Sequence, residues 1–270
     1  MSDVRLIQVP WYLGREHPDL SRGPGTLAEA IGGESVVVPA PQERPVPNEV
    51  ADSFDVIRSV RSAVGEAVQD GRFPLVLAVN CFTSLGTVAG VGRDVGVVWF
   101  DAHGDFHTPD STITGFLDGM GLAMLLGDGW SELRATIEGL RPVPGEHALL
   151  VSARDLDPTE AERVAASGLR RADADTLESA LDQLATRVDA VYVHLDLDVI
   201  DPSVARANVL SVEGGIDTEQ LEQALAAISS RFEIAAAALT AYDLSQDHES
   251  RVPGIAARLA RQLAPEKVAR

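Results

Sequence analysis

The sequence predicts an α/β fold with a mostly parallel sheet covered by helices on both faces. Strand-like and helix-like segments alternate along the whole 270-residue chain, which is the pattern of successive βαβ units. Two short acidic clusters, 101–105 and 196–198, each follow an apolar run that is typical of a buried strand. Because ligands bind beyond the carboxyl ends of parallel strands, the two clusters mark a candidate site.

Seven short apolar or β-branched runs are predicted to be strands. In chain order they are Leu6–Val9, Ser35–Val38, Leu75–Val79, Val95–Phe100, Ala148–Ser152, Ala190–His194 and Ile234–Leu239. Amphipathic stretches between these runs predict helices. The clearest are Val50–Val68, Glu160–Ser167, Thr176–Ala185 and Thr218–Ser230. Asp217 is a plausible N-cap for the last helix. The proline-rich segment 39–47 reads as a loop, and no repeat or linker divides the chain, so we expect a single domain over residues 1–270.

Composition excludes several classes of partner. A net charge of −19 argues against binding to nucleic-acid phosphates and against docking on anionic membranes. The single cysteine, Cys81, excludes an intramolecular disulfide framework. No apolar stretch reaches the ~18–20 residues of a membrane-spanning helix, and residues 1–5 lack the apolar core of a signal peptide. We therefore expect a cytoplasmic protein.

The acidic clusters have the composition of a metal site. Asp101, His103 and Asp105 are spaced by two residues, so an extended backbone would point them to one face, and the same holds for Asp196 and Asp198. Four carboxylates without partners would raise one another's pKa and destabilise the fold, whereas two divalent cations would neutralise them. Oxygen-rich ligation with one imidazole suits Mn²⁺ or Mg²⁺. Two such ions ~3.5–4 Å apart can share a water and lower its pKa. The alternative is a pair of solvated acidic loops.

Further candidates follow other predicted strands, and each has a plainer alternative. Cys81 is either a metal ligand or a buried thiol that packs as an apolar residue. Asp155 and Asp157 would contact a cationic substrate, although Asp157 could equally cap the next helix. Asp243 would pair with a guanidinium or be a solvated turn residue. His194 would support the metal ligands or be a core histidine with satisfied hydrogen bonds.

The loop after the first acidic cluster carries two more candidates. His107 and Asp118 would act as an acid or a base, or would be solvated. Neither a dinucleotide-binding nor a nucleotide-binding fingerprint occurs in the chain. The candidate chemistry is therefore that of a metal centre rather than that of a nucleotide cofactor.

At these residues the chain resembles the ureohydrolases, the family of arginases and agmatinases, nearly from end to end. The resemblance is carried by 10–14 with 22–24, by 101–105 with 108–109, by 154–158 and most specifically by 196–203. It implies an arginase-like three-layer α/β/α sandwich around a mostly parallel sheet. It also implies a manganese pair, a small guanidino-type substrate, hydrolysis of its C–N bond with release of urea or a substituted urea, and assembly into a homo-oligomer.

Carried over residue by residue, the resemblance implies a set of metal ligands. Asp101 and Asp196 would bridge both ions, Asp105 would complete one shell, and His103 with Asp198 would complete the other. Cys81 stands where the family has the histidine of a Gly-Gly-Asp-His motif, because this chain reads Ala-Val-Asn-Cys at 78–81. The ion that shares Asp105 is therefore expected to be weakened or altered, which leaves one or two Mn²⁺ ions. Enzymes that cleave hydroxylated arginine in antibiotic pathways resemble this chain in having that cysteine.

The resemblance further implies which residues act on the substrate. Asp105 and Asp198 would help to stabilise the tetrahedral intermediate and pass a proton to the leaving amine. Asp118 replaces the histidine that shuttles protons in arginases, and at an ordinary pKa of ~4 it would be a poor acid at neutral pH. Asp157 matches the residue that meets the substrate's amino group, and Asp243 is the nearest carboxylate to the position of a guanidinium-pairing glutamate.

The remaining substrate contacts depart from the arginase pattern. The family loop resembles Asn-Thr-Pro followed by Ser-Gly-Asn-x-His, whereas this chain places His107 and Thr114 at the first position of each motif. Phe116 replaces the asparagine, and Leu210 stands about where arginases have a threonine. Plain arginine recognition is thus in doubt. The alternative to an active hydrolase is a metal-binding relative with lost or vestigial catalysis.

Overall fold

A parallel sheet of eight strands forms the centre of the molecule, in the order β2-β1-β3-β8-β7-β4-β5-β6. The computed structural model describes residues 3–264, and all pairings in this sheet are parallel. The strands are β1 (Val4–Val9), β2 (Ser35–Val37), β3 (Phe73–Ala78), β4 (Gly96–Phe100), β5 (Ala148–Val151), β6 (Arg170–Ala172), β7 (Ala190–Asp196) and β8 (Glu233–Thr240). The seven predicted strands are all present with small shifts at their ends. Residues 1–2 and 265–270 of the predicted domain lie outside the described residues.

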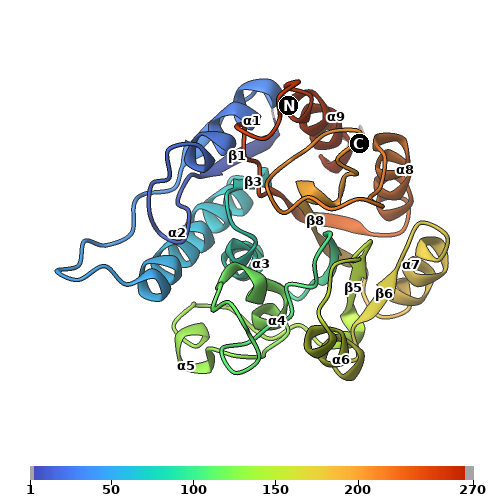
Figure 1. The fold of residues 1–270 in the computed structure, drawn as a ribbon, viewed down its shortest axis with the longest axis horizontal. Helices are drawn as coiled ribbons and strands as arrows, with labels where there is room; N and C mark the ends of the chain where they lie inside the picture. The colour runs from blue at the N-terminus through green and yellow to red at the C-terminus, as the bar shows by residue number, and fades with distance from the viewer. Residues whose placement is uncertain (1–2, 265–270) are drawn as a thin grey trace.

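Helices cover both faces of this sheet, so the predicted three-layer α/β/α sandwich is confirmed. They are α1 (Gly23–Ile31), α2 (Glu49–Gln69), α3 (Ser84–Val91), α4 (Gly121–Leu125), α5 (Ser131–Arg134), α6 (Pro158–Ala166), α7 (Leu177–Ala185), α8 (Thr218–Ser229) and α9 (Val252–Leu263). In Figure 1, α1, α9, α8 and α7 lie along one side of the sheet, and α2, α3 and α4 lie along the other. No helix in the described part of the chain is both long enough and apolar enough to cross a membrane.

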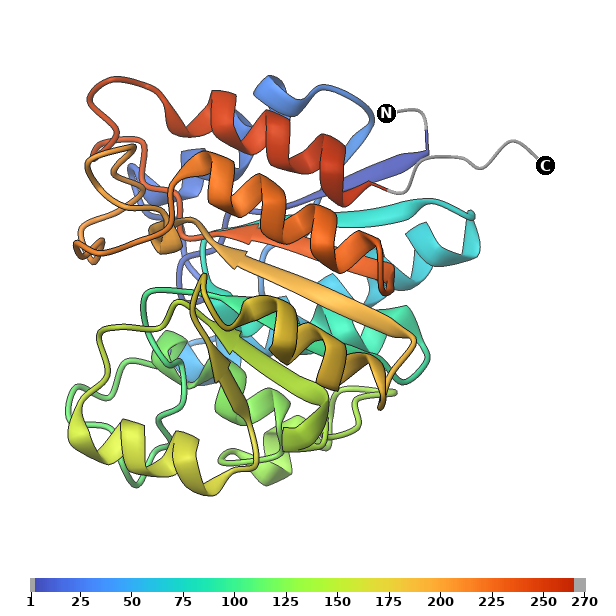
Figure 2. The same cartoon turned by 90° about the vertical axis from the view of Figure 1, so that its right-hand side faces the viewer.

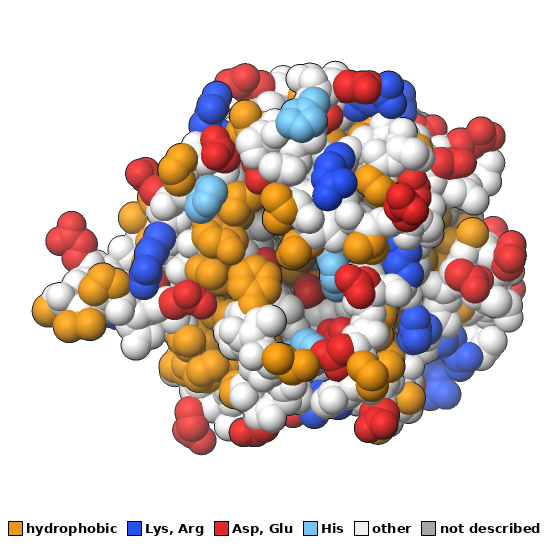
Figure 3. Space-filling view, viewed as in Figure 1, with side chains coloured by type: hydrophobic (Ala, Val, Ile, Leu, Met, Phe, Trp, Pro, Cys, Tyr) orange, Lys and Arg blue, Asp and Glu red, His pale blue; other side chains and the backbone are white. Residues whose placement is uncertain are grey.

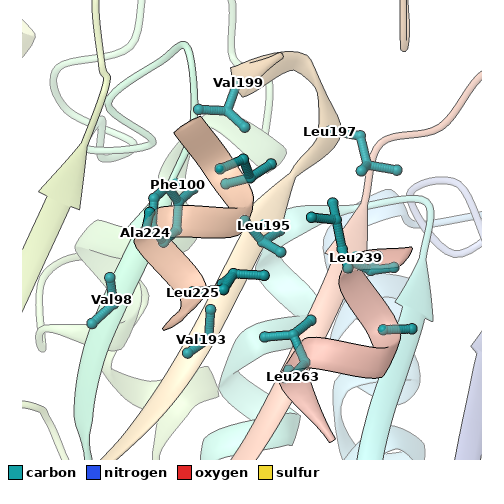
Figure 4. Close-up of a cluster of buried hydrophobic side chains, with 14 of the residues drawn as sticks. Val98, Phe100, Val193, Leu195, Leu197, Val199, Ala224, Leu225, Leu239 and Leu263 are labelled. Atoms are coloured by element: carbon teal, nitrogen blue, oxygen red, sulfur yellow. The ribbon is translucent and has the colours of Figure 1, made fainter. Parts of the chain in front are cut away.

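Alternating side chains of the central strands belong to two separate hydrophobic cores, one on each face of the sheet. On β4, Val98 and Phe100 belong to the core under α7, α8 and α9, whereas Val97 and Trp99 belong to the core under α2, α3 and α4. Figure 4 shows the first core, in which Leu225 of α8 approaches the side chains of the central strands. All residues of β3, β4 and β7 are buried, which explains why these strands read as continuous apolar runs.

The register of the central strands brings their carboxyl ends to one level. Thr240 at the end of β8 pairs with Ala78 on one side and with Asp196 on the other. Phe100, the last residue of β4, pairs with Leu195 of β7. Figure 2 shows the strands from the side with their arrowheads toward the left, so the view of Figure 1 looks onto these ends. The residues that follow the four strands therefore emerge at the same edge of the sheet.

Two of the elements that sequence analysis missed, α3 and β6, lack the pattern it relied on. Helix α3 is buried at all of its positions, so it shows no amphipathic alternation. Strand β6 is only three residues long, and Arg170 and Arg171 are exposed at the edge of the sheet. By contrast, the predicted start of α8 is correct, because Asp217 and Gln220 form a reciprocal capping box.

Helices α2 and α3 pack so closely that their contact requires glycine. A Cβ atom on Gly86 of α3 would lie 2.3 Å from the carbonyl oxygen of Ile57 in α2. We predict that Gly86→Ala lowers the free energy of unfolding by about 1–3 kcal/mol, because the two backbones must separate. Gly65→Ala in α2 is the matched control, since its Cβ would meet nothing nearer than 3.8 Å. That control should be neutral or stabilise by up to about 1 kcal/mol. Equal effects of the two substitutions in urea denaturation would contradict this account of the packing.

Candidate metal centre and substrate pocket

A pocket of about 370 Å³ opens at the carboxyl ends of β3, β8, β7, β4 and β5. Every residue predicted for the site lines it, namely Cys81, Asp101, His103, Asp105, His107, Thr114, Asp118, Asp157, Asp196, Asp198 and Asp243. Figure 3 shows a hollow near the centre of this face, with acidic and histidine side chains in and beside it and hydrophobic side chains along another part of its edge. The structure thus brings together residues that lie more than a hundred positions apart in the chain.

The two acidic clusters converge through turns rather than through extended strands. Strand β4 ends at Phe100, and Asp198 lies in the 3₁₀ turn Leu197–Val199, so the expected extended spacing by two does not persist. In each cluster the first aspartate instead accepts a hydrogen bond from the backbone N–H two residues later. Asp101 Oδ1 accepts from His103 N at 2.8 Å, and Asp196 Oδ1 accepts from Asp198 N at 2.9 Å. These matching turns fold His103 and Asp198 back toward the aspartates that precede them.

Asp101, His103 and Asp198 form a donor set that fits one divalent ion. His103 Nδ1 lies 3.3 Å from Asp101 Oδ1 and 3.4 Å from Asp198 Oδ2. Neighbouring donors around an octahedral ion with bonds of 2.0–2.1 Å are about 3 Å apart, so these separations are close to those of a shared shell. Asn208 donates to Asp198 Oδ2 at 3.2 Å, and the Ala102 N–H donates to Asp198 Oδ1 at 3.2 Å. These two donors fix the orientation of the Asp198 carboxylate.

The side of the pocket that carries Asp105 also fits a cation, but its donor set is different. Asp105 Oδ2 is buried without a hydrogen-bond partner among the described residues, which is costly unless a ligand satisfies it. Asp105 also adopts a φ of 48°, which strains a residue other than glycine. Cys81 Sγ lies 2.9 Å from Asp196 Oδ2 and 3.3 Å from Thr240 Oγ1. The thiol is therefore held against a predicted bridging ligand.

Burial and repulsion between like charges raise the pKa values of several of these aspartates, and a bound cation would lower them again. Burial, with repulsion from Asp198 and other neighbouring aspartates, raises the pKa of Asp101 and of Asp196. Burial next to Asp101 and Asp118 raises the pKa of Asp105. Burial alone would lower the pKa of His103, but Asp101 and Asp198 raise it to about 12. A protonated His103 thus supplies positive charge that a metal ion would otherwise provide.

His194 is a core histidine with satisfied hydrogen bonds, which was one of its two expected roles. Its ring stacks on Trp99 with a centroid separation of 3.6 Å. Its Nδ1 lies 3.0 Å from Ser84 Oγ and its Nε2 lies 3.2 Å from Thr240 Oγ1. Complete burial lowers the pKa of His194 to about 3, so the ring is neutral. It supports the site indirectly, because Thr240 also contacts the Cys81 thiol.

Asp118 is buried, so of its two expected alternatives the solvated aspartate is wrong. Its Oδ2 accepts from Asn80 Nδ2 at 2.6 Å, and its Oδ1 accepts from Phe82 N at 3.1 Å. Burial raises the pKa of Asp118 to about 7, although these hydrogen bonds oppose the shift. The expected pKa near 4 is therefore wrong, and the reason is the removal of the carboxyl from water.

The structure shows the surroundings of the three outer carboxylates. Asp157 caps α6, because its Oδ1 accepts from Glu160 N at 3.0 Å, and its Oδ2 lies 3.0 Å from His107 Nε2; its contact with a cationic substrate stays a prediction. Asp243 is buried rather than solvated, and its Oδ1 accepts from Ser245 N at 2.9 Å. Asp155 is exposed at the mouth, 3.9 Å from His103 Nε2.

Sequence analysis missed the polar residues that hold the site in place. Asn208 bridges Asp198 and the carbonyl oxygen of Ala241, and Asn80 bridges Asp118 and the Leu13 N–H. Glu160 is buried and accepts from the Phe106 N–H at 2.9 Å. A single asparagine or glutamate in a loop or helix carries no periodic signal, although Asn80 does lie directly before Cys81 at a strand end.

Comparison with known proteins gives consistent matches over the whole chain. The sequence profile of the arginase family matches residues 2–266. An arginase from Bacillus caldovelox is 32% identical over 220 residues, covering 77% of this chain and 73% of that protein. An arginase from Bacillus subtilis is 27% identical over 98% of both chains. The solved structure of the native Bacillus caldovelox arginase superposes with a TM-score of 0.87 at 27% identity, over 99% of this chain and 100% of that chain.

Replacing a predicted bridging ligand should remove metal from both positions. We predict that Asp196→Ala or Asp101→Ala abolishes Mn²⁺ binding, because each carboxylate is shared by the two donor sets. Elemental analysis after gel filtration measures the metal content. Asp110→Ala is the matched control, since Asp110 is an exposed carboxylate of the neighbouring loop and should leave the content unchanged. Full metal content in Asp196→Ala would refute the assignment of that residue.

The two metal positions should differ in affinity. The position beside Asp105 has a thiol where the other has an imidazole, so we predict one tightly bound Mn²⁺ per chain and a second that titrates weakly. Cys81→His should tighten the second position, whereas Cys81→Ala should not. Equilibrium dialysis against buffered Mn²⁺ measures both constants. Two equally tight ions in the unmodified protein would contradict the predicted asymmetry.

Proposed function

Because the chain belongs to the arginase family, whose members are hydrolases acting on C–N bonds, we propose that it is a manganese-dependent amidinohydrolase. The bond that it cleaves is of the guanidino type, and the products are an amine and urea or a substituted urea. The observation that carries this proposal is the joining of two donor sets in one pocket. Asp101, His103 and Asp198 form the first set, and the unpartnered Asp105 Oδ2 marks the second.

The residues of the pocket floor would hold the ions. Asp101 and Asp196 would bridge them, His103 and Asp198 would complete one shell, and Asp105 would contribute to the other, with Cys81 beside it. When bound, such a pair of ions lowers the pKa of a water and stabilises negative charge that develops during hydrolysis. The chain's contribution is to keep its carboxylates together and mostly out of solvent, where their electrostatic effect on a reacting group is large.

The residues of the pocket wall would orient the substrate and move its proton. Asp243 keeps Oδ2 available after Oδ1 accepts from Ser245 N, so it can pair with a guanidinium. Burial makes the Asp118 carboxyl a weaker acid than a solvated aspartate, so it would hold a proton and deliver it to the leaving amine, a task shared with Asp105 and Asp198. His107, Thr114 and Asp157 line the outer wall, where they would contact the rest of the substrate.

The second candidate function is a metal-binding relative with lost or vestigial catalysis. Cys81 at a ligand position and Asp118 at the position of a proton-shuttling histidine favour it. Release of urea separates the two functions, since a vestigial site would bind Mn²⁺ and release none from any guanidine. A cytoplasmic location and assembly into a homo-oligomer complete the proposal.

Unmodified L-arginine should be a poor substrate. Phe116 and Leu210 line the pocket where hydrogen-bonding side chains would be needed for the amino-acid end, and a polar group buried without a partner costs ~1–3 kcal/mol, or about five- to 150-fold in affinity. An N-hydroxyguanidine or a less polar guanidine should perform better. The electron-withdrawing hydroxyl of the first makes the guanidine less basic and its carbon easier to attack, and the second loses no polar contacts. We predict a higher kcat/KM for hydroxyarginine than for arginine with one Mn²⁺-loaded preparation. An arginine value equal to or above that of hydroxyarginine would overturn this interpretation of the pocket.

A further inference from the structure

The pocket changes character between its floor and its mouth. The floor is built from the carboxylates described above, whereas Leu20, Phe116, Val209 and Leu210 line the outer part. Val209 and Leu210 are 61% and 51% exposed, although large apolar side chains are normally withdrawn from water. Ile113, in the same loop as Phe116, is 85% exposed. Apolar side chains gathered around one opening indicate a surface that a ligand covers.

Apart from His103 and His107, the described lining offers no basic side chain that would neutralise a substrate carboxylate. Nine of its residues are Asp or Glu, and none is Lys or Arg. Arg154 lies nearby, but its guanidinium donates to the carbonyl oxygens of Asp198 and Val212 at 3.0 and 2.8 Å. A carboxylate entering the outer part of this pocket would therefore lose hydration, face like charges and find no Lys or Arg partner.

The lining also leaves little for a substrate ammonium group. The wall carboxylate Asp157 is already engaged by His107 Nε2 and by the Glu160 N–H. The hydroxyls of Thr112 and Thr114 accept from the N–H groups of Gly115 and Phe116, at 3.0 and 3.1 Å. Asp155 remains, but its side chain is 62% exposed, and ion pairs at such positions contribute little. His107 therefore already contacts the Asp157 carboxylate oxygen that the ammonium group of a ligand would otherwise use.

From these three features we infer that the substrate is a guanidine whose far end is uncharged and apolar, such as an alkyl or aryl group, rather than an amino acid. This inference rests on the proposed function for the guanidine itself. The floor would receive the guanidinium beside Asp243, and the chain of carbon atoms would extend outward between Phe116 and the Val209–Leu210 segment. Contact with these side chains would remove apolar surface from water on both partners.

Three ligands of similar length test the inference directly, because they differ in the charge at the far end. They are n-butylguanidine, agmatine with its terminal ammonium, and 4-guanidinobutyrate with its carboxylate. Titration calorimetry of the Mn²⁺-loaded protein measures binding, and a urea assay on the same samples measures kcat/KM. We expect n-butylguanidine to bind best and 4-guanidinobutyrate to bind at least about tenfold more weakly. Extending n-propylguanidine to n-pentylguanidine should raise affinity about sixteenfold, since each of the two added methylenes contributes about fourfold when buried.

A matched pair of variants links the preference to the mouth of the pocket. Val209→Thr exchanges one methyl for a hydroxyl in the lining and should reduce the preference for n-pentylguanidine over agmatine about threefold. Val46→Thr makes the same exchange at an exposed position in the loop before α2 and should leave the preference unchanged. Phe116→Asn should reduce the preference further and improve binding of 4-guanidinobutyrate or arginine.

The two measurements separate failure of the inference from failure of the proposed function. Tighter binding of 4-guanidinobutyrate, agmatine or arginine than of n-butylguanidine would overturn the inference, whether or not urea is released. An unchanged preference in both Val209→Thr and Phe116→Asn would also overturn it. The expected order of binding without urea from any ligand would support the inference about the pocket and refute the proposed hydrolase.

Discussion

The mutual repulsion of buried carboxylates at the carboxyl edge of the sheet is the constraint on which the rest of this structure depends. Asp101, Asp105, Asp196 and Asp198 are all buried, and charge removed from water is costly unless it is paired. The fold reduces this cost with local donors, since backbone N–H groups serve Asp101, Asp196 and Asp198. Asp105 Oδ2 receives no such donor from the described residues. We therefore propose that bound cations complete the arrangement.

Two of the departures from the arginase pattern, Cys81 and Asp118, lie on one side of this centre. Cys81 follows β3, and Asp118 accepts from Asn80 and Phe82, the two residues that flank Cys81. The opposite side, formed by His103, Asp198 and Asn208, keeps an imidazole and fully oriented carboxylate oxygens. If the proposed metal pair is bound, a change confined to the side of Cys81 and Asp118 would alter one metal position and the nearby proton donor together and would leave the other position intact. This separation explains why a modified donor set is compatible with a retained fold and a retained pocket.

The sequence predicted the layers and the residues of the site, but not how the site is held. Strands β3, β4 and β7 are recognisable because burial on both faces demands continuous apolar residues, and parallel register then places the following residues at one edge. Helix α3 was not predicted, because a helix that is buried all round has no amphipathic periodicity in its sequence. The raised pKa of Asp118 and the pairing of His107 with Asp157 depend on tertiary contacts between loops, and no local pattern encodes those contacts.

The central claim is that the buried carboxylates need divalent cations, and thermal unfolding of the metal-free protein tests it most directly. A ligand that binds only the folded state stabilises it by about 2.7 kcal/mol at one hundred times its dissociation constant. The account predicts that Tm rises with the logarithm of Mn²⁺ concentration, by several degrees, and that K⁺ at equal ionic strength does not reproduce the rise. Asp198→Asn should reduce the rise, because it removes a predicted metal ligand. A Tm that is insensitive to millimolar Mn²⁺, or equally sensitive to K⁺, would contradict the account.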